Sequence, residues 1–72
     1  MDTNKLKSKM ALYGDTGRDL AEYLNISRTT LSGKMNETNG AEFTQSEILK
    51  IKKRYQLGGS EIDEIFFNEK VS

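Results

Sequence analysis

The chain lacks cysteine, histidine, proline and tryptophan. Without cysteine it has no disulfide framework, and without cysteine and histidine the usual zinc sites are excluded, so we expect neither a metal nor another cofactor. The absence of proline and the scarcity of β-branched residues in the periodic segments favour an all-α fold. A chain of 72 residues allows one domain, 1–72, which helix packing around a single core must stabilise.

Membrane and catalytic signatures are also missing. The longest apolar run is far shorter than a bilayer span, and the first ten residues lack the apolar segment of a signal peptide, so we expect a cytoplasmic protein. No cysteine nucleophile, histidine base or glycine-rich phosphate loop after a strand is present. The sequence therefore predicts a binding protein with no small-molecule substrate, and not an enzyme.

Net charge is absent too, because eleven basic side chains balance eleven acidic ones. The distribution is uneven: residues 1–35 carry six basic and four acidic side chains, a net charge of +2, and the remainder carries −2. After Leu57 the acidic residues outnumber the basic ones four to one. Any surface that contacts nucleic acid is therefore expected away from the C-terminus.

What the chain does contain is a pair of short helical patterns in residues 16–35. In the first, Leu20, Ala21 and Leu24 fall on one face of a helix, with the small Ala21 where a second helix could approach closely. Asn25 follows, and asparagine tolerates the left-handed backbone that ends a helix. The sequence predicts a tight turn at this point.

The second pattern begins at Ser27, a good N-cap, and continues with Leu31 and Met35 on one apolar face. Its opposite face carries Arg28, Thr29, Ser32 and Lys34. This arrangement is typical of a helix-turn-helix, whose second helix enters the major groove of DNA. The alternative is an ordinary corner between two helices of a small helical domain.

Periodicity and capping signals divide the whole chain into five expected helices. They span residues 3–13, 17–24, 28–35, 45–56 and 61–68. The expected core consists of Leu6, Met10, Leu20, Ala21, Leu24, Ile26, Leu31, Ile48, Ile51 and Phe66.

Three of these helices have recognisable starts. Thr16 with Asp19 forms a capping pair for the second helix, with Asp15 as the rival cap. For the fourth helix, Thr44-x-x-Glu47 is a capping box enclosed by Phe43 and Ile48. Ser60 is the expected cap of the last helix.

Two features allow either a structural or a binding role. The basic run at residues 50–54, KIKKR, could contact phosphates or could simply match the dipole at the end of its helix. Phe66 and Phe67 point about 100° apart on a helix, so both cannot occupy the centre of one narrow apolar face. One of them covers the edge of the core or serves as an exposed anchor for a partner.

The segments LAEYLNISRTTLSGKMN, EFTQSEILKI and EIDEIFF together resemble the small phage regulators of the Cro and lambda-repressor-like helix-turn-helix group. More narrowly, the chain is similar to the Cro-type modulator-of-repression proteins of temperate phages of lactic-acid bacteria. The resemblance covers nearly the whole chain. It implies a five-helix lambda-repressor-like DNA-binding domain, with the helix-turn-helix at helices 2 and 3, that acts in the lysis-lysogeny switch of a phage inside its bacterial host.

By position, the resemblance implies base contacts from Arg28, Thr29, Ser32 and Gly33, and phosphate contacts near Gly17, Arg18 and Lys34. The chain departs from the group at Gly17, where many relatives carry a phosphate-contacting glutamine. Gly33 also offers no side chain to a base and costs about 1 kcal/mol of helix propensity. These departures and the zero net charge weaken the prediction of autonomous DNA binding.

Two functions are therefore expected from the sequence. One is a Cro-like regulator that binds operator DNA, and the other is an antirepressor that binds the phage repressor and blocks its DNA-binding domain. The candidate residues for either target are Gly17, Arg18, Ser27, Arg28, Thr29, Ser32, Gly33 and Lys34, with Tyr23 and Phe67 as candidate anchors for a protein partner.

Overall fold

The structure is a computed structural model that describes residues 1–67, and within them the protein is all-helical with no strand. Its elements are α1 (Thr3–Leu12), α2 (Gly17–Leu24), α3 (Arg28–Asn36), the short 3₁₀ helix η1 (Thr38–Gly40), α4 (Gln45–Tyr55) and α5 (Gly59–Phe66). The predicted all-α class and the five α-helices are confirmed in this part of the chain. The last helix, predicted to reach residue 68, ends earlier, at Phe66, because Phe67 has left the helical backbone conformation (φ −117°, ψ 16°).

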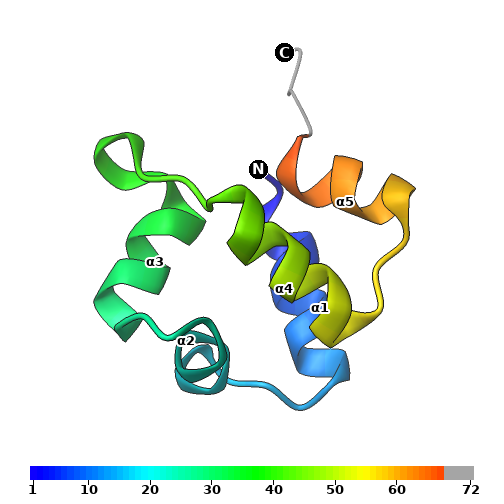
Figure 1. The fold of residues 1–72 in the computed structure, drawn as a ribbon, viewed down its shortest axis with the longest axis horizontal. Coiled ribbons are helices and arrows are strands. Elements are labelled where there is room, and N and C mark those ends of the chain that lie inside the picture. Colours follow the sequence, from blue (N-terminus) through cyan, green and yellow to red (C-terminus); the bar gives the residue numbers. More distant parts are fainter. Residues whose placement is uncertain (68–72) are drawn as a thin grey trace.

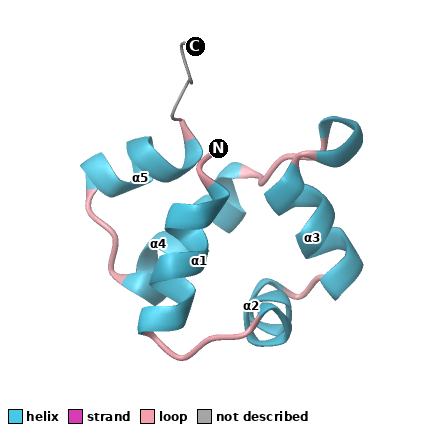
Figure 2. Ribbon diagram, turned by 180° about the vertical axis from the view of Figure 1, so that it is seen from behind, coloured by secondary structure: helices cyan, strands magenta, loops and turns pink. Residues whose placement is uncertain are grey.

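The helices form a small bundle in which α1 and α4 lie in the middle (Figure 1). Both ribbon views place α3 on one side of this pair and α5 on the other (Figures 1 and 2). Helix α2 packs against α3, and α1 packs against α5. The outward surfaces of α3 and α5 are therefore well separated.

Helices α1 to α4 each contribute at least two apolar side chains to one buried core, and α5 contributes one. The buried apolar residues are Leu6, Met10, Leu20, Ala21, Leu24, Leu31, Met35, Ile51, Tyr55, Leu57 and Ile65. Three predicted core residues, Ile26, Ile48 and Phe66, lie partly buried at its edge. The prediction placed them too deep because each has one side open at the rim of the bundle.

The capping signals settle the start of α2. The Thr16 hydroxyl accepts a hydrogen bond from the Asp19 N–H, and the Asp19 carboxylate accepts one from the Thr16 N–H. Thr16 is thus the cap, and Asp15 is held by α4 instead. Thr44 and Glu47 form the same reciprocal pair at the start of α4, as predicted.

The start of α5 corrects the prediction. The helix begins at Gly59, two residues before the expected start, and Ser60 lies inside it. Gly58 occupies the cap position, and its N–H donates to the Glu61 carboxylate at 3.1 Å. The Glu61 carboxylate, at the third position of the helix, thus satisfies the Gly58 N–H, and Ser60 is not the cap.

None of the helices in residues 1–67 combines the length and the apolar character needed to cross a membrane.

Candidate nucleic-acid interface

The turn between α2 and α3 fixes how α3 is presented. Asn25 adopts the left-handed conformation (φ 59°), and the Ile26 N–H donates to the Ala21 carbonyl at 3.0 Å. Ser27 then caps α3 by accepting a hydrogen bond from the Thr30 N–H at 3.1 Å. The sequence-predicted turn and cap are both confirmed, so local chemistry sets the angle between the two helices.

Helix α3 is anchored along one side only. Leu31 and Met35 are buried against the body, at 2% and 7% exposure. Arg28, Thr29 and Ser32 point the other way and are exposed. With Gly33 and Thr38, they line a wide, shallow hollow on the outside of the helix. Such an open surface fits a macromolecule better than an enclosed small ligand.

A second hollow adjoins the first, between α1, α2 and α3. It is lined by Lys7, Gly17, Arg28, Leu31, Ser32, Met35 and Asn36. Within residues 1–67, neither Lys7 nor Arg28 forms an ion pair. A Cβ atom added at Gly17 would lie 3.9 Å from the Arg28 guanidinium, so this cation lies beside the first residue of α2. The hollow therefore combines two cations that can attract one anionic group.

The sequence pattern does not single out Lys7 as a site residue. Its neighbours on α1, Lys5 and Lys9, form ion pairs with Glu64 and Glu61 of α5. Lys7 lies between them in sequence but lines the hollow beside α3. Only the pairing of α1 with the acidic α5 distinguishes this lysine from the other two, and the sequence pattern contains no such long-range signal.

Lys34, which the resemblance places near phosphates, pairs with a carboxylate of α4. Its ammonium donates to both Glu47 carboxylate oxygens, at 2.6 and 2.8 Å, and its side chain is only 16% exposed. Burial alone would raise the pKa of the Glu47 carboxyl, but the hydrogen bonds from Lys34 and from the Thr44 N–H hold it below its ordinary value. Lys34 therefore links α3 to α4.

The remaining predicted residues divide in two groups. Gly17, Arg28, Thr29, Ser32 and Gly33 line the two adjoining hollows. Arg18 is exposed on α2 and pairs with Glu22 at 3.5 Å, while the Ser27 hydroxyl is engaged in capping α3. The four residues expected to contact bases thus lie together. Of the three expected near phosphates, Gly17 lies with them, whereas Arg18 and Lys34 do not line either hollow.

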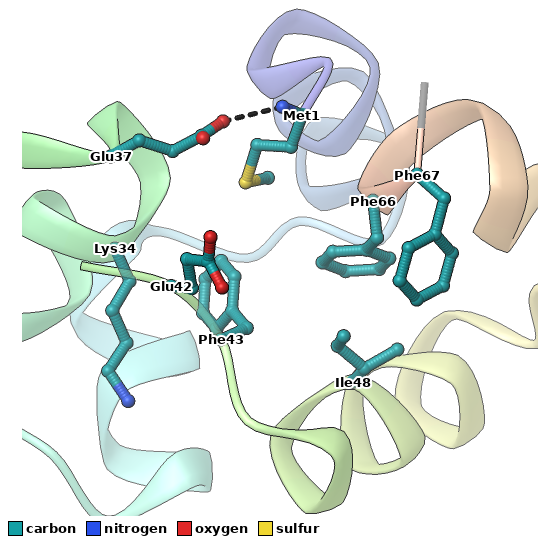
Figure 3. Close-up of a pocket in the computed structure, with 8 residues that line it drawn as sticks. All are labelled: Met1, Lys34, Glu37, Glu42, Phe43, Ile48, Phe66 and Phe67. Carbon is teal, nitrogen blue, oxygen red and sulfur yellow. Dashed lines mark hydrogen bonds and ion pairs between the residues drawn. The ribbon is translucent and has the colours of Figure 1, made fainter. Parts of the chain in front are cut away.

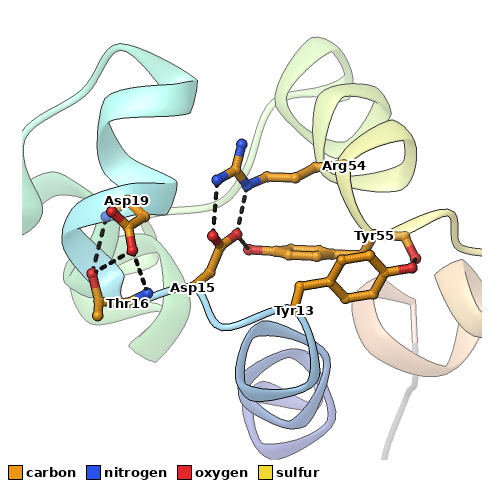
Figure 4. Close-up of polar contacts among 6 residues, drawn as sticks. All are labelled: Tyr13, Asp15, Thr16, Asp19, Arg54 and Tyr55. Carbon is orange, nitrogen blue, oxygen red and sulfur yellow. Dashed lines mark hydrogen bonds and ion pairs between the residues drawn. The ribbon is translucent and has the colours of Figure 1, made fainter.

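A polar network links the loop between α1 and α2 to α4 (Figure 4). Arg54 donates two hydrogen bonds to Asp15, at 2.5 and 2.8 Å, and the Tyr55 hydroxyl donates a third at 2.7 Å. The hydrogen bond from Arg54 is the main reason that the pKa of the Asp15 carboxyl lies below its ordinary value. Burial, followed by the nearby Asp15 carboxylate, raises the pKa of Tyr55.

This network also involves one of the two candidate anchors. The Arg54 guanidinium lies over the Tyr23 ring, 4.6 Å from its centroid, so Tyr23 has an intramolecular role although it is 37% exposed. In the basic run, Arg54 is thus engaged within the fold, while Lys50, Lys52 and Lys53 remain exposed. Phe67, the other anchor, is 60% exposed.

Comparison with known proteins adds no relative, since no family model, curated protein or solved structure matches the chain. The geometry of α2 and α3 and the charges around them are therefore the features that bear on function.

Proposed function

We propose that the chain is a helix-turn-helix DNA-binding protein of Cro type, a transcriptional regulator in the lysis-lysogeny switch of a phage. The observation that carries this proposal is the presentation of α3, which buries Leu31 and Met35 and exposes Arg28, Thr29 and Ser32. A single α-helix exposed in this manner can enter the major groove, where side chains of its first turns reach base edges.

The exposed groups have different tasks in this proposal. Arg28 can donate a bidentate pair of hydrogen bonds to guanine, and Thr29 and Ser32 can donate or accept at neighbouring bases. Lys7, next to the same hollow, supplies a charge for the phosphate backbone. Gly33 keeps the outer side of α3 open, since a Cβ atom added there would meet nothing within 4 Å.

A second function, antirepressor action through the phage repressor protein, is favoured by a separate observation. Lys5, Lys9, Lys34 and Arg54 are all engaged with carboxylates. The two hollows beside α3 have only two cationic lining residues, Lys7 and Arg28, and neither forms an ion pair within residues 1–67. Few phosphate contacts give weak binding at physiological salt. A repressor's DNA-binding domain could instead be held by polar and apolar contacts, which salt weakens less.

The two functions are separated by titrating labelled promoter DNA of the phage and labelled repressor against the protein, each from low to moderate salt. We expect operator binding that exceeds binding to a scrambled duplex but is weak at physiological salt, together with tight repressor binding of milder salt dependence. Equal binding to operator and scrambled DNA contradicts the regulator proposal. Nanomolar operator binding with no detectable repressor binding contradicts the antirepressor proposal.

A further inference from the structure

An aromatic pocket lies between the end of α3, the segment before α4 and the end of α5 (Figure 3). Its volume is about 180 Å³, and its walls carry all three phenylalanines of the chain, Phe43, Phe66 and Phe67. Within residues 1–67 it shares no lining residue with the two hollows beside α3. The aromatic pocket is therefore separate from the surface used in the proposed function.

The rings of this pocket stand at an angle to one another. Phe66 meets Phe43 edge to face, with ring centroids 5.8 Å apart and planes at 86°. Figure 3 shows the Phe67 ring beside Phe66 and above Ile48, and Phe67 is 60% exposed. The face of an aromatic ring carries the negative part of its quadrupole and attracts cations. A corner formed by several rings therefore favours a cationic guest.

The charges at the pocket favour a cation as well. Glu37 is paired with the Met1 ammonium at 2.5 Å, and Lys34, the lining lysine, is paired with Glu47. Glu42 is exposed and forms no ion pair within residues 1–67. In this part of the chain, the lining charge that remains without a partner is thus a carboxylate beside phenylalanine rings.

The size of the pocket limits what it can hold. A volume of about 180 Å³ is below the roughly 300–1,000 Å³ of pockets that enclose a whole small molecule, so one side-chain head group fits better. Among cationic head groups, the arginine guanidinium is planar, stacks on aromatic rings and donates two parallel hydrogen bonds to a carboxylate. Arginine is also enriched among the residues that contribute most to protein interfaces.

We propose that the aromatic pocket binds an arginine side chain of a partner protein. The guanidinium lies against the phenylalanine rings and donates to the Glu42 carboxylate, which satisfies its charge and its hydrogen-bond donors together. Because this site shares no residue with the outward side of α3, a protein partner and DNA can be bound at the same time.

An NMR titration of the full chain with arginine blocked at both ends (acetylated and amidated) tests the proposal. The signals of Glu42, Phe43 and Phe67 should shift, with a dissociation constant of about 1–10 mM for this single side chain. Blocked citrulline has nearly the same shape but no charge, so it should bind at least about threefold more weakly. Blocked lysine should bind more weakly than arginine, because its ammonium lacks the planar fork.

Two variants examine the two parts of the pocket. Glu42→Gln should weaken arginine binding about two- to fivefold and leave citrulline binding unchanged. Phe67→Leu keeps an apolar side chain but removes one ring, and it should also weaken arginine binding about two- to fivefold.

The matched control removes a carboxylate from a neighbouring surface. Asp63 lines a groove between α4 and α5, together with Leu49, Lys52, Ile62 and Phe67. Asp63→Asn loses the same charge as Glu42→Gln but does not alter the aromatic pocket, so it should bind arginine as the wild type does. Far-ultraviolet circular dichroism verifies that each variant is folded.

Three results overturn the proposal. Citrulline binds as tightly as arginine, or Glu42→Gln and Asp63→Asn weaken binding equally, or tetramethylammonium binds more tightly than blocked arginine. The last result assigns the pocket to a small free cation instead of a protein side chain. None of these measurements involves DNA, so the arginine site can fail while the proposed function stands, or the reverse.

Discussion

The outward side of α3 and the groove between α4 and α5 are both exposed, but their side chains differ in kind. Around α3 the groups are small, polar or cationic, and Arg28 and Lys7, which form no ion pair with any residue in 1–67, share one hollow. In the groove, Leu49 and Phe67 are apolar and lie between one cation and one anion. The first surface suits an anionic polymer, and the second suits a protein surface.

Other charged residues lie on neither surface, because they are paired inside the fold. Lys34 and Arg54 are held by Glu47 and Asp15 in contacts between α3 and α4, and between the α1–α2 loop and α4. These two ion pairs link the helices of the bundle to one another. Lys7 and Arg28, in contrast, lie in a hollow that a partner can reach. Zero net charge is thus compatible with local basic character.

The largest expected effect on stability comes from a substitution in the buried core, on which both surfaces depend. Leu20 is fully buried, so Leu20→Ala should lower the free energy of unfolding by about 2–5 kcal/mol. Leu49→Ala, at the exposed groove, should change it by less than about 0.5 kcal/mol. Urea denaturation followed by circular dichroism measures both, and equal destabilisation by the two variants contradicts the assignment of Leu20 to the core.

A smaller loss is expected from the framework ion pair. Glu47→Gln keeps an acceptor for the Thr44 N–H but leaves the Lys34 ammonium without its carboxylate, which should cost about 1–3 kcal/mol. Lys5→Gln, in an exposed pair with Glu64, is the matched control and should cost less than about 1 kcal/mol. Thermal or urea unfolding of both variants should reproduce this order; the reverse order is incompatible with a structural role for Lys34.

Acid should weaken the same framework. The pKa values of the Asp15 and Glu47 carboxyls lie below their ordinary values, so the unfolded chain binds protons first. Their contribution to stability is therefore complete above the unfolded pKa, about 4, and declines as the pH falls further. Unfolding measured between pH 7 and pH 2 should show a shallower acid decline for Asp15→Asn than for wild type; an unchanged acid slope would show that Asp15 carries no such linkage.

The two cations beside α3 should differ in their effects on DNA binding. Arg28→Ala should reduce discrimination at one base pair by about 1–3 kcal/mol, because a base contact is lost. Lys7→Ala should weaken all sequences equally and reduce the logarithmic salt slope by about 0.9. Lys53→Ala, distant in sequence from both, is the control. Anisotropy titrations with operator variants measure these effects, and identical responses of the Arg28 and Lys7 variants contradict the division of roles.

The smallest effects compare two glycines. A Cβ atom added at Gly33 in α3 or at Gly59 in α5 meets nothing within 4 Å. Gly33→Ala should stabilise the fold by about 0.5–1 kcal/mol, because alanine loses less backbone entropy in a helix. If DNA approaches α3 closely, the same change should weaken DNA binding, whereas Gly59→Ala should leave it unaffected. Stronger DNA binding by Gly33→Ala contradicts a close approach at that position.

Local features of the fold were predictable because their causes are local. The caps at Thr16, Ser27 and Thr44 depend on residues three positions apart, and the turn at Asn25 depends on one left-handed residue. The ion pair between Asp15 and Arg54 joins residues 39 positions apart, so no periodic pattern signals it.

In the candidate site, too, local features were predictable and long-range contacts were not. The outward side of α3 followed from the spacing of Leu31 and Met35, because the residues opposite a buried face must be exposed. Ion pairs between distant parts of the chain decided which cations remained available to a partner. Lys34 is paired with Glu47, whereas Lys7 lines the hollow beside α3. A charge count along the sequence includes both lysines and cannot separate them.

The central claim is that DNA contacts the outward side of α3 and not the groove between α4 and α5, and amide chemical-shift mapping by NMR tests it most directly. Duplex DNA containing the operator, added at low protein concentration, should shift the signals of Gly17, Arg28, Thr29, Ser32 and Gly33. The signals of Leu49, Ile62 and Phe67, which line the groove between α4 and α5, should stay unchanged. If DNA shifts residues 50–53 of α4 and leaves α3 unchanged, the assignment of α3 as the nucleic-acid interface is wrong.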